Sequence, residues 1–195
     1  MSENELSARE RIVVGAADML SRRGLNATSI RETAKHAGAP LGSTYHYFPD
    51  GKGQLTAEAV RYAGDRVAKG LRRALRQGPE AGLRAYLNVW RSIVVDSDYR
   101  VGCPVLAVAI EEPEAEERSV ALQAAAEVFD TWQDLLAASL REHGTPPEQA
   151  AQLAALVVAA AEGAVAMCRA QRTTAVLDAV EAQLNALVRA ATEGR

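Results

Sequence analysis

The chain has 195 residues, of which 48% are hydrophobic and 5% aromatic, and its formal net charge is −3. Its core must therefore come mainly from Ala, Leu and Val, and Ala has the highest helix propensity. Because no strand-like alternation stands out, composition predicts an all-α fold. The polar, acidic start predicts no secretory signal, and the most apolar stretch, residues 153–167, is too short to span a membrane. We expect a cytoplasmic protein with no membrane partner.

The charges are distributed unevenly along the chain. Residues 1–76 contain 13 Lys and Arg and 8 Asp and Glu, a net of +5, which leaves −8 on the remainder. A basic end on an acidic body is typical of proteins that present one end to a polyanion, although local charge variation alone gives the same pattern.

The side chains that carry chemistry are few and scattered. Cys103 and Cys168 lie far apart and match no metal-ligand spacing, so we expect buried or half-buried, reduced thiols and neither a metal nor a cofactor. His143 stands alone near a predicted helix end, where it suits the helix dipole. Because no catalytic motif is present, the chain is not expected to be an enzyme.

Start and stop signals divide the chain into about nine helices. Ser7 is expected to cap a first helix that ends at Arg23-Gly24, and Ser29, with Glu32 three residues on, to cap a second in preference to Thr28. A third helix starts near Pro40 and must end before Pro49. The remaining helices are expected at about 55–76, 80–95, 104–111, 122–140, 147–169 and 174–192, with a solvated acidic connection at 111–117.

The second and third helices predict a helix-turn-helix over residues 28–48. Ala34 is small where the two helices would cross, and Gly38 allows a positive φ in the turn. The third helix holds no acidic residue but carries two tyrosines that flank a histidine. Small residues suit close approach to base edges, and hydroxyls suit phosphates. The alternative is that both tyrosines simply pack on the first helix.

These residues resemble the DNA-binding domain of the TetR family. The match covers about residues 12–55 and rests on Thr28, Ile30, Ala34, Ala37-Gly38 and the Tyr-His-Tyr-Phe sequence that ends at Phe48, followed by a lysine. The resemblance implies a helix-turn-helix domain at residues 1–53 that binds double-stranded operator DNA. The implied DNA-contacting residues are Thr28, Ser29, Arg31, Leu41, Gly42, Ser43, Tyr45, His46, Tyr47 and Lys52.

The sequence departs from the family pattern in three places. Thr33 and Thr44 stand where Ile or Leu is usual, which predicts a slightly more polar core. The turn between Phe48 and Leu55 is longer than usual. Together with Gly102-Cys103-Pro104, this longer turn resembles the LmrA/YxaF-like subgroup.

Residues 54–195 are expected to bind a small molecule and to form a homodimer. Apolar seams on the last two helices suit packing across a two-fold axis. A dimer is also favoured because one helix-turn-helix reads too few bases for useful specificity. The alternative is that both seams belong to the protomer core. The predicted interface residues are Leu153, Val157, Ala160, Ala164, Leu177, Val180, Leu184 and Leu187.

A pocket for an apolar effector is expected among the fifth to eighth helices, because the few bulky side chains gather there. The candidate lining residues are Tyr86, Trp90, Ile93, Cys103, Leu106, Ile110, Phe129, Trp132 and Met167. Glu162 interrupts an apolar stretch and is expected to face solvent at a helix edge, the alternatives being a ligand contact or a pair with Arg across an interface. The sequence thus predicts a ligand-responsive transcriptional regulator, and the family resemblance implies a repressor, although nothing in the sequence excludes activation. The alternatives are a thiol redox sensor using Cys103 or, less favoured, a helical enzyme.

Overall fold

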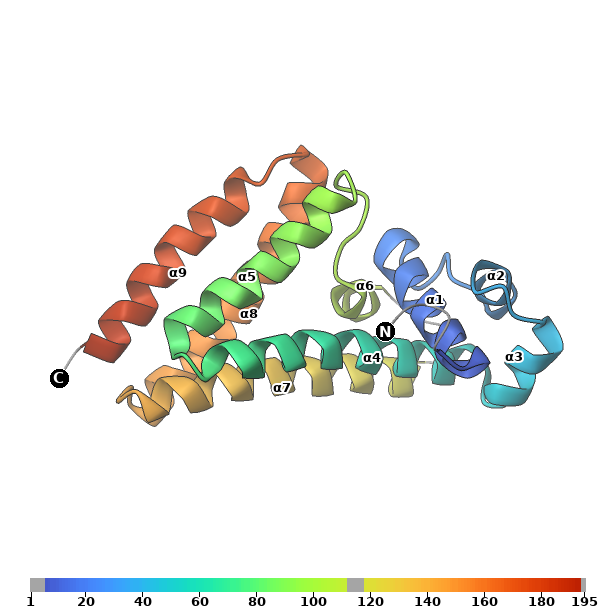
Figure 1. The fold of residues 1–195 in the computed structure, drawn as a ribbon, viewed down its shortest axis with the longest axis horizontal. Helices are drawn as coiled ribbons and strands as arrows, with labels where there is room; N and C mark the ends of the chain where they lie inside the picture. Colours follow the sequence, from blue (N-terminus) through green and yellow to red (C-terminus); the bar gives the residue numbers. More distant parts are fainter. Residues whose placement is uncertain (1–5, 112–117, 194–195) are drawn as a thin grey trace. The chain divides into compact units, whose positions relative to one another are not determined.

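The computed structural model describes residues 6–111 and 118–193. Within these ranges the fold is nine α-helices without a strand, which confirms the all-α prediction (Figure 1). The helices are α1 (Ala8–Arg23), α2 (Ile30–His36), α3 (Leu41–Tyr47), α4 (Gly51–Leu75), α5 (Pro79–Asp96), α6 (Pro104–Ile110), α7 (Arg118–Glu142), α8 (Pro147–Gln171) and α9 (Ala175–Glu193).

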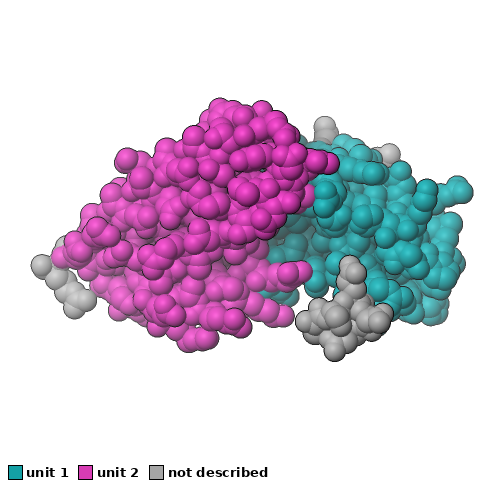
Figure 2. All heavy atoms as spheres, turned by 45° about the horizontal axis from the view of Figure 1, so that its top comes forward, with its two compact units in different colours: residues 1–65, 104–128 teal, residues 66–103, 129–195 magenta. Residues whose placement is uncertain are grey.

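Two compact units divide the chain (Figure 2). The first unit comprises residues 1–65 and 104–128, and the second comprises residues 66–103 and 129–195. Helices α4 and α7 therefore contribute residues to both units. The boundary expected between residues 53 and 54 does not coincide with this division into compact units, and it stays a prediction.

The signals that begin and end the first helices act as expected. Ser7 and Glu10 form a complete capping box at α1, and α1 stops at Gly24, whose φ is +81°. Ser29 caps α2 by accepting a hydrogen bond from the Glu32 amide at 3.2 Å. These local bonds satisfy helix-terminal amides that would otherwise lack partners.

The two threonines that depart from the family pattern are fully buried, and their hydroxyls are paired locally. Thr33 donates to the carbonyl of Ser29 at 2.8 Å, and Thr44 donates to the carbonyl of Pro40 at 3.3 Å. Each bond runs back four residues along its own helix, so the hydroxyl costs the core little.

In the second unit α8 packs against α9 and α5, and α5 also packs against α9. Arg91 on α5 joins α9 through ion pairs with Asp178 and, at 2.6 Å, Glu181. The hydrogen bond from Arg91 lowers the pKa of the Asp178 carboxyl. Thr145, before α8, donates to the carbonyl of Ala191 at 3.0 Å.

Helix α8 is longer than the apolar stretch that the sequence singled out. Among the described residues it is the one helix with the length and hydropathy of a membrane span, and half of its most apolar window is buried inside the protein. A buried core helix passes the same test, so this is weak evidence for a membrane segment. Most of the acidic connection lies outside the described residues, but its first residue, Glu111, accepts backbone bonds rather than being simply solvated.

Candidate DNA interface and buried core

In the first unit, small residues allow α2 and α3 to pack closely against each other and against α1. Ala34 is 2% exposed where the two helices pack, and Gly38 has a φ of +62° in the turn between them. A Cβ on Gly15 of α1 would lie 3.3 Å from the Ala37 side chain, so α1 approaches the turn closely there. Gly15 is not among the predicted functional residues, and its signal in the sequence is a glycine in the apolar stripe of α1.

Most of the predicted DNA-contacting residues are at the surface. Tyr45 is 54% exposed and Leu41 39% exposed, and no acidic residue stands on α3. These α3 residues therefore offer hydroxyl, imidazole and small apolar groups without a charge that would repel phosphate. The exposed members of the set are Ser29, Arg31, Leu41, Gly42, Tyr45 and His46, and the half-buried ones are Ser43, Tyr47 and Lys52.

Thr28 differs from the rest of the set, because it lies inside the first unit. Its side chain is 4% exposed and its hydroxyl donates to the carbonyl of Gly24 at 2.7 Å. Thr28 thus fixes the loop before α2. Of the adjacent Thr28 and Ser29, both predicted to contact DNA, only Ser29 is exposed.

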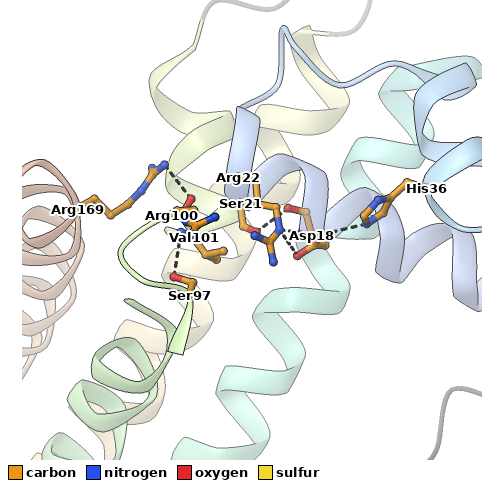
Figure 3. A network of polar contacts seen from close by, with 8 residues as sticks. All are labelled: Asp18, Ser21, Arg22, His36, Ser97, Arg100, Val101 and Arg169. Carbon is orange, nitrogen blue, oxygen red and sulfur yellow. Dashed lines mark hydrogen bonds and ion pairs between the residues drawn. The ribbon is translucent and has the colours of Figure 1, made fainter. Parts of the chain in front are cut away.

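An acidic side chain on α1 contacts the last residue of α2. Asp18 bonds Arg22 on its own helix at 2.9 Å and reaches Nε2 of His36, the last residue of α2, at 3.0 Å (Figure 3). The contact adds to the apolar packing between α1 and α2, so α2 is held at its C-terminal end as well as by its cap.

An aromatic cluster occupies the core of the second unit. Tyr86 and Trp90 of α5 meet Trp132 of α7, with the three ring centroids 5.8–6.2 Å apart in edge-to-face arrangements. Phe129 packs edge-on against Trp132 at 5.8 Å. Edge-to-face pairs of this kind are favourable beyond the area that they bury. We name Tyr86, Trp90, Phe129 and Trp132 the aromatic cluster.

Glu162 of α8 is buried beside this cluster, and the expectation that it faces solvent is wrong. Its side chain is 4% exposed and acts electrostatically on Tyr86. Val158 and Val165, one turn to either side, are buried on the same helix face, a periodicity that predicts the burial of Glu162. Burial raises the pKa of its carboxyl to about 7, against a smaller opposing effect of Cys103.

The buried core holds polar atoms that lack partners. Within the part of the chain that the structure describes, no hydrogen bond of normal geometry reaches either carboxylate oxygen of Glu162, the Tyr86 hydroxyl or the Trp90 indole nitrogen. Burial, and then the Glu162 carboxyl, raise the pKa of the Tyr86 phenol well above its ordinary value, so the phenol keeps its proton. Buried polar groups are almost always paired, so this concentration calls for an explanation.

The other candidate lining residues are placed differently. Leu106 and Ile110 belong to the first unit, where Ile110 is 72% exposed, and Met167 of α8 is 47% exposed. Ile93 is half-buried on α5. Elsewhere in the second unit, a groove of about 360 Å³ is lined by Gly70, Arg73, Ala74, Gln77, Ala81, Arg84, Ala85 and Asn88.

The helix seams proposed for dimerisation lie mostly inside the protomer, in agreement with the alternative interpretation. Each helix turns its larger apolar residues toward its own core: Leu153, Val157, Ala164, Leu177 and Leu184 are 0–7% exposed. Ala160 and Val180 are half-buried. Leu187, at 45% exposed, is the member of the set that a second copy could reach.

Neither cysteine forms a disulfide, and both are buried. Cys103 is 4% exposed beside Glu162, so burial does not favour a thiol that reacts with oxidants. Among the described residues no group of three or more His, Cys, Asp or Glu side chains is placed to hold a metal ion. His143 lies 2.8 Å from the carbonyl of Ser139, at the C-terminal end of α7.

Two family models match the chain. Residues 12–59 match the model of bacterial regulatory proteins of the tetR family, and residues 79–183 match the model of the C-terminal domain of LmrA/YxaF-like transcriptional regulators. The first match spans the helix-turn-helix, and the second spans the aromatic cluster and Glu162.

Full-length relatives agree with these models. The chain is 42% identical over 183 residues to the helix-turn-helix-type transcriptional regulator Rv0196 of Mycobacterium tuberculosis, covering 92% of this chain and 93% of that one. It is 30% identical over 186 residues to the regulator YxaF of Bacillus subtilis, covering 93% and 95%. A TetR transcriptional regulator from Legionella pneumophila shares the fold at a TM-score of 0.80 and 18% identity, covering 93% and 97% of the two chains.

Proposed function

The chain belongs to the TetR family of bacterial regulatory proteins, in its LmrA/YxaF-like branch, and from this membership we propose that it is a repressor controlled by a small molecule. It is a transcriptional regulator rather than an enzyme. We propose that it acts in the cytoplasm as a homodimer, binds palindromic operator DNA, and releases that DNA when a mostly apolar effector binds.

The observation that carries this proposal is the division of polar groups in α2 and α3. The buried hydroxyls of Thr28, Thr33 and Thr44 all bond backbone carbonyls of their own segment. Arg31 and Tyr45 are exposed, and none of the hydrogen bonds or ion pairs within the described residues involves their side chains. Groups that are exposed and not needed for folding are the ones available for base edges and phosphates.

Two copies are needed because one pair of short helices reads few base pairs. In a symmetric dimer the two α3 helices would enter successive major grooves about 34 Å apart. We propose that α4, whose residues belong to both units, carries the response. Its tilt on effector binding would move the heads out of register, and a tenfold loss of DNA affinity needs about 1.4 kcal/mol of differential binding.

The first test is a fluorescence-anisotropy titration of the protein with the DNA upstream of its own gene. We expect sequence-selective binding that weakens steeply as salt rises, because phosphate contacts release counterions. Arg31→Ala should cost about 1–3 kcal/mol on the preferred sequence and relax the preference at one position, since arginine reads base edges. Tyr45→Phe should weaken binding to all sequences alike.

The matched control is Arg84→Ala, which removes an exposed arginine from α5 in the second unit. It should leave DNA affinity within about twofold of the parent. Binding that is insensitive to salt, or equal for the upstream DNA and for a scrambled duplex, would sink the proposal.

A further inference from the structure

Glu162 is a buried acid for which the described residues supply no counter-charge. Its side chain is 4% exposed, and neither oxygen has a hydrogen bond of normal geometry. Tyr86 of α5 and Cys103, which precedes α6, are the titratable groups that act with it, and neither is a cation. A buried carboxylate is normally paired with a positive group or with several donors, because its desolvation is costly.

Protein packing alone does not explain the position. An apolar residue would bury the same helix face without leaving two oxygens unpartnered, and Val158 and Val165 do so one turn away. The Tyr86 hydroxyl, on which the carboxyl acts, and the Trp90 indole N–H also lack partners of normal geometry, and these two side chains act on each other. Glu162 of α8 thus acts on Tyr86 of α5, and Tyr86 in turn contacts Trp90, in the buried core of the second unit.

The surroundings of this carboxyl favour a particular chemistry. The aromatic cluster brings Tyr86, Trp90 and Trp132 within 6.2 Å of one another, ring centroid to centroid. Aromatic rings attract cations and stack on or against planar ligands. A carboxylate beside such rings suits a ligand in which a positively charged nitrogen is attached to an aromatic group.

We propose that Glu162 is the polar anchor of the effector site and that the effector is a small aromatic molecule carrying a protonated amine. The ammonium donates to the Glu162 carboxylate, and the aromatic part lies among the rings of the aromatic cluster. This inference rests on the proposed function, in which the second unit binds an effector. It names the chemical class that the effector belongs to.

The test uses three probes with one aromatic body and different head groups: para-phenylbenzylamine, para-phenylbenzyl alcohol and para-phenylbenzoate. The two tryptophans of the chain, Trp90 and Trp132, both lie in the aromatic cluster, so tryptophan fluorescence reports directly on this site. We expect the amine to bind about tenfold or more tightly than the alcohol, because only the amine forms a charge-assisted bond, and the benzoate to bind more weakly still.

Glu162→Gln keeps the shape of the side chain and removes the charge. In this variant the affinities for the amine and the alcohol should differ by no more than about threefold. Glu148→Gln, the same change at an exposed position in the first turn of α8, should leave all three affinities unchanged. Circular dichroism and thermal melting establish that both variants are folded.

A second measurement needs no variant. Amine affinity of the parent protein should fall as pH drops below about 7, where the carboxyl takes up a proton, while alcohol affinity stays level. Equal binding of amine and alcohol, an amine preference that survives in Glu162→Gln, or no binding by any probe overturns the inference. These titrations contain no DNA, so the proposed function fails separately, through the operator-binding assay.

Discussion

At the scale of a single residue, Glu162 loses nearly all of its hydration when the chain folds, and burial raises the pKa of its carboxyl from 4.5 to about 7. Between these two values the folded protein holds the proton more tightly than the unfolded chain does. The free energy of unfolding therefore decreases as pH rises through this window and stays low above it. Most carboxyl groups have the opposite effect, since their pKa values fall on folding.

Glu162→Gln should remove this dependence. The difference in free energy of unfolding between variant and parent is measured by urea denaturation at about pH 5 and at about pH 8. Between these two pH values it should change by about 2–3 kcal/mol in favour of the variant at the higher pH. The exposed Glu148→Gln serves as control and should shift stability equally at the two values. Parallel behaviour of Glu162→Gln and the parent would show that Glu162 is not the source.

At the scale of elements, α6 is anchored to the loop that joins α1 and α2. The Glu111 carboxylate, directly after α6, accepts the backbone amides of Leu25 at 2.9 Å and Asn26 at 2.8 Å. A Cβ on Gly24 would overlap that carboxylate, so the loop is shaped around it. Helix α6 packs on α1 and follows Cys103 directly in the chain. The chain from Cys103, a neighbour of Glu162, to Glu111 therefore ends at hydrogen bonds to the loop before α2 of the predicted DNA-binding domain.

Glu111→Ala should leave two loop amides without their acceptor. We expect a loss of about 1–3 kcal/mol in free energy of unfolding and faster hydrogen exchange at Leu25 and Asn26, as measured by denaturation and NMR. Glu127→Ala, which removes an exposed ion pair with Arg61 on the same unit, should cost less than about 1 kcal/mol. If the two variants behave alike, Glu111 does not clamp the loop.

At the scale of the whole molecule, the proposed dimer needs a face that the protomer leaves open. Leu156 and Met167 of α8 and Leu187 of α9 are 45–47% exposed. The same two helices also expose a series of small residues, which allow close helix approach. Those small residues are Ala151, Ala155, Ala159, Gly163, Ala166, Ala170, Ala179, Ala182, Ala186 and Ala190.

A charge on this face should break the dimer. We expect Met167→Glu and Leu187→Glu to convert a dimer into a monomer in sedimentation velocity, because each would bury an unpaired carboxylate on association. Asn88→Glu, at an exposed position on α5, should leave the mass unchanged. A parent protein that sediments as a monomer at micromolar concentration would contradict the dimer itself.

The sequence was informative wherever a signal was local. Caps such as Ser7 and Ser29, and helix ends at Gly24 and before Pro49, depend on neighbours a few residues away, and the structure confirms them. The orientation of α8 and α9 was harder to predict, since an Ala-rich helix has apolar residues on several faces. Tertiary packing decided which face is buried. Glu162 and Glu111 were misjudged for the same reason, because their neighbours come from distant parts of the chain.

The separation between buried and exposed polar groups in the head has an evolutionary consequence. Thr28, Thr33 and Thr44 maintain the fold, whereas Arg31, Tyr45 and His46 lie at the surface. Surface substitutions away from caps and cores usually change stability by less than about 0.5 kcal/mol. Paralogues of this protein could therefore diverge in the promoters they recognise without passing through unstable intermediates, and new regulatory circuits could arise by gene duplication followed by change at a few exposed positions.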